Sequence, residues 1–260
     1  LSLGLLALGW WVYSCVMQEG DKARNWRSRW RRIWVGAVWM ACLFHWTSYL
    51  LRWYIGGRIP LGNGHETMLF LAGFLLLCTC IWQRRFSFLL PAGLLLSGFT
   101  LLVAYLSEMN PQITPLMPVL LSPWLSLHVS LIMVSYALFA LMCLCSILAL
   151  SIRRHTWQRQ RLTLFCRVLL YPAVLCLGIG IFIGAVWANV SWGSYWAWDP
   201  KEVWALITFM LYGMAFHVQS LPRFRNPYFF HWFLIVSFSA ILMTYFGVNY
   251  ILGGMHSYAG

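Results

Sequence analysis

The chain is organised around residues 192–202, which read Trp192-Gly193-Ser194-Tyr195-Trp196-Ala197-Trp198-Asp199-Pro200-Lys201-Glu202. Long apolar runs flank this polar and aromatic stretch on both sides. Its second half predicts a helix start, with Asp199 as the N-cap, Pro200 in the first helical position and Glu202 completing a capping box. Its tryptophans are suited to cover a large planar ligand, and an aromatic belt at a membrane surface is the alternative.

The composition excludes an ordinary soluble domain. Hydrophobic residues make up 61% of the chain and charged residues 9%, with a mean hydropathy of +0.71, whereas soluble domains carry about 25% charged residues. We therefore expect an all-α, polytopic transmembrane helical bundle that forms a single domain over residues 1–260. Eight runs are long enough to cross a hydrocarbon core about 30 Å thick. The expected spans are 1–18, 33–55, 66–83, 87–107, 124–152, 166–188, 201–218 and 227–252.

Lys and Arg are divided unequally between the expected connections. The stretches that hold 15 of the 18 are 19–32, 84–86, 153–167 and 219–226. The positive-inside rule places these stretches in the cytoplasm, and it places both ends of the chain and the tryptophan-rich loop outside. A net charge of +12 would suggest nucleic acid in a soluble chain. Here we expect the basic stretch 22–32 to contact anionic lipid of the bilayer, and we expect no nucleic-acid partner.

The eight cysteines lie in apolar runs or beside basic stretches, and no Cys-x-x-Cys pair occurs. A redox pair or a covalent haem-attachment motif within this chain is therefore not expected. We interpret the cysteines as small packing residues.

Two histidines are expected near the tryptophan-rich loop. His128 lies four residues into the span that starts near Trp124, about 6 Å from its outer end, and His256 follows the last span. Two imidazoles beside an aromatic surface are what a six-coordinate haem requires, one nitrogen on each axial face of the iron. His217 lies 18 residues beyond Asp199 on the same expected helix, about 27 Å away and near the cytoplasmic face.

Four segments resemble one family. Residues 192–202 resemble the W-G-x-x-W-x-W-D signature of haem-handling proteins of cytochrome c biogenesis, and the Asp-Pro-Lys-Glu continuation is similar to the CcsA (ResC) branch. That branch is the membrane subunit of the system II cytochrome c synthase. Residues 124–137 resemble its W-L-x-x-H-V segment, 247–258 its G-V-N and G-L-H-S-Y segments, and 52–66 its R-W, P-L and N-x-x-E segment.

The resemblance implies haem b as the bound substrate, with a loop over residues 189–202 that contacts it. His128 and His256 would be the external iron ligands and the catalytic residues that present haem. The implied haem-contacting residues are Trp192, Gly193, Trp196, Trp198, Asp199, Trp124 and Arg52. Arg52 would bind a haem propionate, or alternatively would extend to the membrane interface.

The resemblance also implies a second haem site, within the bundle, with His217 as an iron ligand. The other ligand would come from a CcsB-like membrane protein, either separate or fused upstream. His45 and His231 are alternatives within this chain, although we expect both to be hydrogen-bonded packing residues.

The implied function is haem transport and thioether attachment of haem to the Cys-x-x-Cys-His motif of apocytochrome c, as a holocytochrome c synthase working with CcsB. The implied location is the bacterial inner membrane, with attachment at its outer face. One alternative is a haem exporter or chaperone similar to CcmC, without synthase activity. Another is a membrane b-type cytochrome for electron transfer, which predicts histidine pairs on facing helices.

Overall fold

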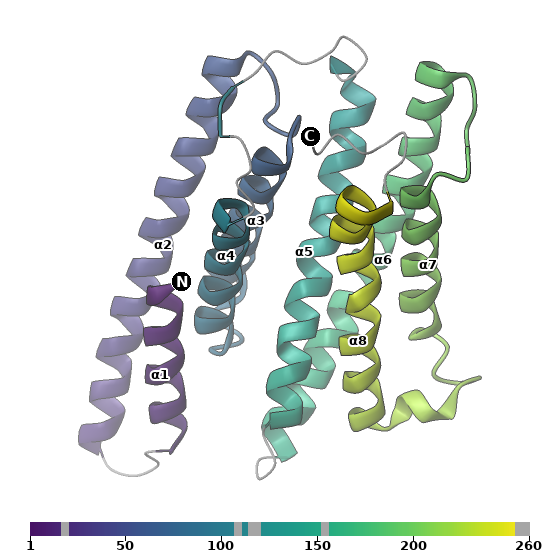
Figure 1. The fold of residues 1–260 in the computed structure, drawn as a ribbon. Coiled ribbons are helices and arrows are strands. Elements are labelled where there is room, and N and C mark those ends of the chain that lie inside the picture. Colours follow the sequence, from purple (N-terminus) through teal and green to yellow (C-terminus); the bar gives the residue numbers. More distant parts are fainter. Residues whose placement is uncertain (17–20, 107–110, 114–120, 152–155, 253–260) are drawn as a thin grey trace. The chain divides into compact units, whose positions relative to one another are not determined.

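The computed structural model describes residues 1–16, 21–106, 111–113, 121–151 and 156–252. Every regular element in these ranges is helical (Figure 1), which confirms the all-α class. The helices fall into two compact units, residues 1–114 and 115–260, which are described separately. The expectation of a single domain over residues 1–260 stays a prediction.

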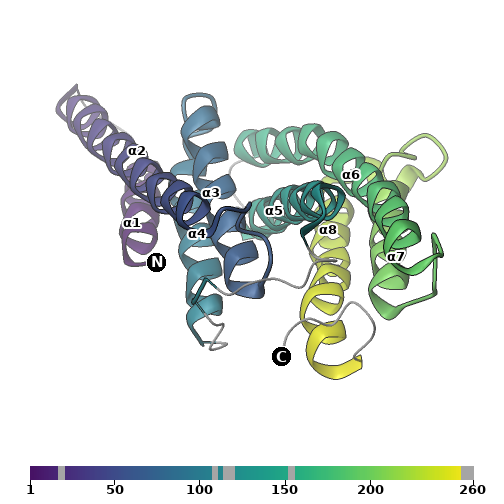
Figure 2. The same ribbon diagram turned by 90° about the horizontal axis from the view of Figure 1, so that it is seen from above.

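Among the described residues, unit 1 contains four helices and unit 2 contains the others. The elements of unit 1 are α1 (Ser2–Val16), α2 (Asp21–Gly56), α3 (Gly64–Trp82) and α4 (Leu89–Leu106). Those of unit 2 are α5 (Pro123–Ser151), α6 (Thr156–Trp192), α7 (Pro200–Met214), the short η2 (Pro222–Arg225), α8 (Pro227–Leu242) and the π-helix η3 (Met243–Leu252). Seen from above in Figure 2, α5 lies between α6 and α8.

Six of the described helices, rather than eight, are long and apolar enough to cross a membrane. They cover Arg29–Gly56, Gly64–Trp82, Leu89–Leu106, Pro123–Ser151, Gln158–Trp192 and Pro227–Val248. The expected spans 1–18 and 201–218 correspond to α1 and α7, which have 15 residues each. At 1.5 Å per residue such a helix is about 22 Å long, shorter than a hydrocarbon core of about 30 Å. The polytopic class is confirmed, and the count of eight spans is corrected.

Two stretches expected as basic loops are mostly helical. α2 begins at Asp21 and α6 at Thr156, so both helices start well before the apolar runs that predicted them. Arg, Lys and Gln are good helix formers, so a helix continues into a basic segment without a break. The sides assigned to these segments stay a prediction.

Small residues allow the helices of unit 1 to pack closely. A Cβ atom at Gly4 of α1 would lie 2.7 Å from the Leu95 backbone nitrogen of α4, and one at Gly73 of α3 would lie 2.8 Å from the His45 ring of α2. A Cβ at Gly93 of α4 would overlap the hydroxyl of Thr79 on α3. Close backbone approach at small residues favours helix association in membranes. Lipid tails are as apolar as the side chains, so burial of apolar side chains gives no driving force there and van der Waals packing takes its place.

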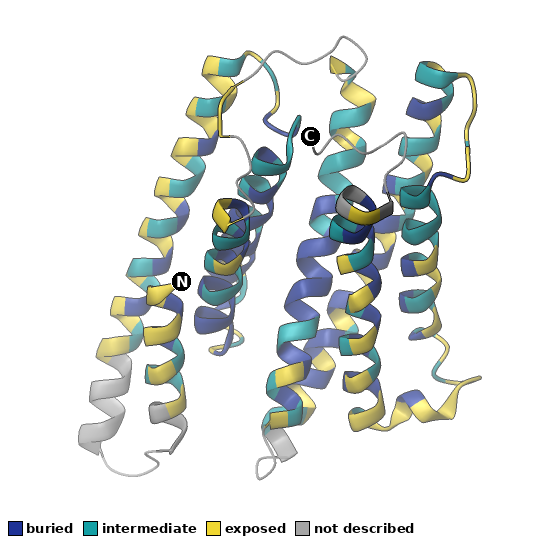
Figure 3. Cartoon of the chain, in the orientation of Figure 1, coloured by how far each residue is buried: buried dark blue, intermediate teal, exposed yellow. Residues whose placement is uncertain are grey.

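In unit 2, α5 forms a long contact with α6, and its middle part is mostly buried (Figure 3). A Cβ at Gly180 of α6 would lie 2.8 Å from the Ile132 side chain of α5. Tyr212 of α7 stacks on Phe139 of α5, with ring centroids 3.8 Å apart. The core of unit 2 therefore joins α5 to α6 and α7 by direct side-chain packing.

The cysteines agree with the packing interpretation. The seven whose side chains are described are free thiols, and five of them are buried in the helical core. They are Cys42, Cys78, Cys80, Cys143, Cys145, Cys166 and Cys176.

We expect Gly93→Ala to lower the free energy of unfolding by about 1–3 kcal/mol, because the added methyl group overpacks the contact with Thr79. Gly36→Ala is the matched control, since no atom lies within 4 Å of its added Cβ. The measurement is thermal unfolding of each purified variant in the same detergent. Equal midpoints for the two variants would contradict the close packing of α3 on α4.

Candidate functional site

The tryptophan-rich loop connects the end of α6 to the start of α7 (Figure 1). Trp192 is the last residue of α6, and its ring meets Trp187 edge to face with centroids 4.8 Å apart. Gly193 has φ +79, a left-handed conformation that terminates α6 at little cost for glycine. Trp196 and Trp198 form a T-shaped pair with ring centroids 6.0 Å apart. The loop therefore carries a group of aromatic rings held by contacts with one another.

The helix start predicted from the sequence is confirmed. Asp199 is the N-cap of α7, its Oδ1 atom accepts a hydrogen bond from the Lys201 backbone nitrogen at 3.0 Å, and the capping box with Glu202 is complete. Asp199 is 5% exposed, so its carboxylate is held inside the loop by this role. Burial lowers the pKa of Lys201 to about 8, and the nearby Asp199 carboxylate acts in the opposite direction. The Lys201 ammonium is therefore still mostly charged at pH 7.

The Glu202 carboxylate holds the backbone of Trp198 in a strained conformation. Trp198 has φ +57, which costs a residue with a side chain about 1–2 kcal/mol. The backbone nitrogens on either side of it, those of Ala197 and Asp199, both donate to Glu202 Oε2, at 2.9 Å and 3.2 Å. The Trp198 side chain is 74% exposed. Strain maintained to display an exposed indole is typical of a functional position.

His128 lies on α5 and contacts α6. Its Nδ1 is 2.7 Å from the Gly180 carbonyl oxygen, and a Cβ at Gly184 would lie 2.5 Å from the same nitrogen. A carbonyl accepts hydrogen bonds, so the Nδ1 atom carries the proton and Nε2 is the nitrogen with the lone pair. A backbone carbonyl on the second ring nitrogen is the usual arrangement for a metal-ligating histidine, because it fixes the tautomer and the ring orientation.

Trp124 lies four residues before His128 on α5, and a spacing of four places both on one face of a helix. Its side chain is exposed. The second predicted external ligand, His256, lies outside the described residues.

His217 does not lie on the helix of Asp199 as predicted. α7 ends at Met214, and His217 is an exposed residue of the connection to η2. The sequence 211–218 is apolar, which is why the helix seemed to continue, but the backbone turns after Met214 through short-range bonds such as His217 N to Met214 O at 3.1 Å. His217 and Asp199 still lie at opposite ends of α7.

The two histidines named as alternative ligands have structural contacts. His231 is fully buried, with Nε2 2.8 Å from Thr163 Oγ1 and Nδ1 3.0 Å from Ser146 Oγ. It thereby joins α8 to α6 and α5. The Nε2 atom of His45 is 2.8 Å from the Leu69 carbonyl oxygen. Both agree with the interpretation as hydrogen-bonded packing residues.

Arg52, in unit 1, binds a carboxylate and two backbone carbonyls. Its Nε lies 3.1 Å from Glu66 Oε1, and its terminal nitrogens donate to the carbonyl oxygens of Pro111, at 2.7 Å, and Gln112, at 3.1 Å. Arg58 also pairs with Glu66, at 2.8 Å, and Glu66 is 1% exposed. Binding of a haem propionate by Arg52 stays a prediction, and so does its alternative at the membrane interface.

The sequence reasoning missed Gly180 and Gly184. Their spacing, Gly-x-x-x-Gly within an apolar run, is a known signal for close helix contact. It also missed the pairing of Arg58 with Glu66, for which the only signal was that three charged residues lie close together in an otherwise apolar region.

These features define a multi-pass helical membrane protein in which α5 carries a half-buried histidine and the connection between α6 and α7 exposes Trp198. A sequence model of the family described as Cytochrome C assembly protein matches residues 61–256. Because this match covers most of the chain, the chain belongs to that family, within its CcsA/ResC group.

Several curated proteins are similar to the chain. Protein NrfI of Wolinella succinogenes is 39% identical over 229 residues, which cover 85% of this chain and 25% of that protein. The cytochrome c biogenesis protein CcsA of Chlamydomonas reinhardtii is 36% identical over 228 residues, covering 80% of this chain and 63% of that protein. CcsA of Prochlorococcus marinus is 32% identical over 251 residues, covering 80% and 79%. The chain thus spans a quarter of NrfI and less than two thirds of the algal CcsA.

We expect Glu66→Gln to lower the free energy of unfolding by about 3–5 kcal/mol, because it leaves two arginines beside a buried position without their counter-charge. Adding Arg58→Gln should restore part of the loss by removing one of the unpaired charges. Detergent-solubilised variants are compared by chemical unfolding. A loss below about 1 kcal/mol, the value typical of a surface pair, would contradict the buried role of Glu66.

Proposed function

We propose that this chain handles haem for cytochrome c biogenesis and presents it for covalent attachment to apocytochrome c. The observation that carries the proposal is the placement of His128, whose Nδ1 is 2.7 Å from the Gly180 carbonyl oxygen. This contact orients Nε2 as the coordinating atom. Family membership and the displayed tryptophans support haem as the substrate.

His128 and His256 would bind the two axial faces of the haem iron, with the loop of Trp192, Trp196 and Trp198 against the porphyrin. Aromatic side chains bury a large planar apolar surface, and imidazole is a common iron ligand. Gly193 and Asp199 would shape this loop rather than touch iron, and Trp124 would flank His128. The rigid contact of α5 with α6 would keep the His128 ring in place.

The chemistry itself needs no nucleophile from this chain. A thioether forms when the sulfur of a substrate cysteine bonds to a haem vinyl carbon and the thiol proton goes to the neighbouring vinyl carbon. This addition changes no net electron count, so orientation of haem is the main contribution of the protein. The histidine of the incoming Cys-x-x-Cys-His motif would replace His128 or His256 on the iron.

We further propose that haem arrives through a second site that includes His217, on the cytoplasmic side, with the other iron ligand from a CcsB-like partner. The attachment site would then lie at the outer face of a bacterial inner membrane. The contacts of His231 and His45 support this proposal over an electron-transfer cytochrome, because both histidines are used to join helices.

His128→Ala should lower the haem retained by the purified chain and shift its absorption spectrum, and added imidazole should restore both, because free imidazole can occupy the vacated axial position. His155→Ala is the control, since His155 belongs to the basic stretch 153–167 that the sequence predicts to be cytoplasmic, away from the proposed outer site. If haem retention is unchanged by both His128→Ala and His256→Ala, the proposed outer site is wrong. Holocytochrome formation with a CcsB partner separates a synthase from a CcmC-like exporter.

Gly184→Ala should weaken haem binding about tenfold or more while His128 itself is intact, because the added methyl group would displace the imidazole ring from the Gly180 carbonyl. The measurement is haem titration followed by absorbance. Gly213→Ala, with no atom within 4 Å of its Cβ, is the matched control. Equal affinities for the two variants would show that the position of the His128 ring does not matter.

A further inference from the structure

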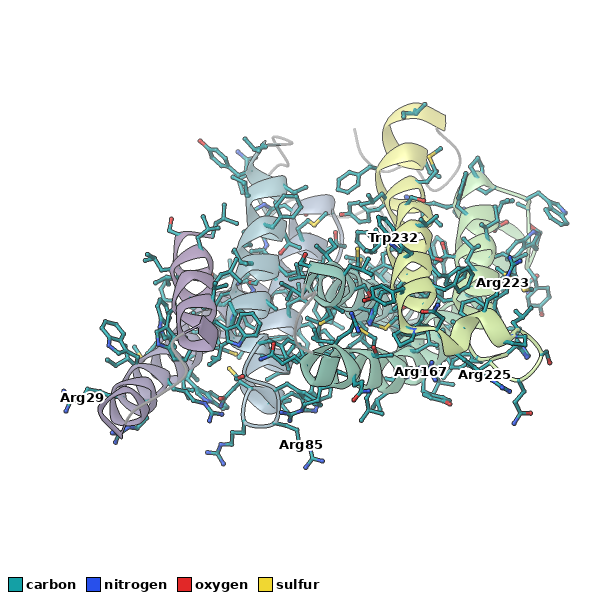
Figure 4. All side chains as sticks on the ribbon, turned by 90° about the horizontal axis from the view of Figure 1, so that it is seen from below. Arg29, Arg85, Arg167, Arg223, Arg225 and Trp232 are labelled. Atoms are coloured by element: carbon teal, nitrogen blue, oxygen red, sulfur yellow. The ribbon has the colours of Figure 1, made fainter. Side chains whose placement is uncertain are left out.

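The connection between α7 and α8 gathers arginines at one end of unit 2. Arg223 and Arg225 belong to η2, six and eight residues after His217, and both are exposed. Arg167 of α6 reaches the same segment, because its Nη2 donates to the Phe224 carbonyl oxygen at 2.9 Å. Figure 4 views this end of the unit and labels the three arginines around η2. We call Arg167, Arg223 and Arg225 the η2 arginines.

The η2 arginines have no carboxylate partner in their unit. Residues 115–260 contain two acidic side chains, Asp199 and Glu202, and both lie at the opposite end of α7. Among the described residues, the side chains of Arg223 and Arg225 make no hydrogen bond. The Nε atom of Arg167 is buried and, within the same described residues, also lacks an acceptor. The Arg167 guanidinium also lies over the Phe230 ring, 5.2 Å from its centroid. Guanidinium groups without a carboxylate nearby are suited to bind a carboxylate that comes from outside the unit.

An apolar surface adjoins these charges. Tyr171 lies one turn beyond Arg167 on α6, and its ring centroid is 5.0 Å from that of Phe216, the residue before His217. Exposed apolar side chains continue along this helix at Leu164, Val168 and Leu175. The connection between α7 and η2, η2 itself and the part of α6 that they contact thus carry an imidazole, an aromatic and aliphatic surface, and guanidinium groups. A ligand that fits all three is a flat apolar molecule that carries carboxylates.

We propose that the η2 arginines bind the propionate carboxylates of haem at the His217 site. This inference rests on the proposed function, which brings haem to His217. An arginine binds a carboxylate through two parallel hydrogen bonds, which fixes direction as well as affinity. Haem held in this way has its propionate edge at η2 and its vinyl edge against the apolar side chains of α6. The arginines would therefore set the orientation in which haem enters the protein.

The test compares haem with haem dimethyl ester, whose propionates carry no charge. Both are titrated into the full chain in phosphatidylcholine nanodiscs, in the His128→Ala, His256→Ala background and without imidazole, so that the outer site is not filled. We expect haem to bind about tenfold more tightly than the ester, as for one charge-assisted pair. In Arg223→Gln, Arg225→Gln protein, where Arg167 alone remains, the haem affinity should fall most of the way to that of the ester, whose own affinity should not change.

Controls keep the outcomes separate. Arg84→Gln, Arg85→Gln removes the same charge from unit 1 and should preserve the preference for haem. Arg223→Lys, Arg225→Lys keeps the charge and should retain part of it. The comparison of haem with its ester needs no substitution at η2, so it remains decisive even if the glutamine variant is unstable.

Three results would overturn the inference. Equal affinity of haem and ester, with His217→Ala still weakening both, would exclude propionate binding while leaving haem at His217. No effect of His217→Ala on either porphyrin would remove the His217 site itself, and with it this inference. An effect of the glutamine variant that appears only in phosphatidylglycerol nanodiscs, and equally for both porphyrins, would assign the η2 arginines to a lipid phosphate.

Discussion

Close contact between α5 and α6 at glycine determines where the candidate site can form. Gly180 and Gly184 lack side chains at the points where α5 presents Ile132 and His128, so the two helices approach until the imidazole meets a backbone carbonyl. Helical carbonyls normally bond within their own helix, and a side chain reaches one only where the surface is open. The glycine pair thus does two things at once. It packs the longest helix pair of unit 2 and it sets the tautomer of His128.

The charged groups of this apolar chain are few, and the ones at the ends of helices maintain local geometry. Glu202 closes the capping box of α7 and also holds the amides on both sides of Trp198. Glu66 holds Arg52 and Arg58 near the first turn of α3. In a low-dielectric environment a carboxylate with several donors is far more stable than one without them. Glu202 and Glu66 therefore each anchor a loop that hydrophobic packing alone would leave undefined.

The two ends of unit 2 carry different sets of side chains. One end has His128, the tryptophans and the N-terminus of α7, and the other has His217 and the η2 arginines. The first provides imidazole and aromatic surface, and the second adds the positive charge of arginines, with Asp199 and Glu202 at the other end of α7. Under the proposed function, a haem with two propionates and two vinyl groups would be recognised differently by each set. Their separation along α7 and α6 would give the protein two chemically distinct places for the proposed substrate.

The sequence alone determined the features that depend on neighbouring residues or on composition. The apolar content predicted a helical membrane protein, and the spacing of Asp199, Pro200 and Glu202 predicted the start of α7, because a cap requires only three or four adjacent residues. Features that depend on distant segments were decided by the tertiary structure. His128 meets Gly180 across 52 positions. α7 ends at Met214, before His217, although the apolar pattern continues. Apolar periodicity marks which residues avoid water, but only packing decides where a helix ends and which groups meet.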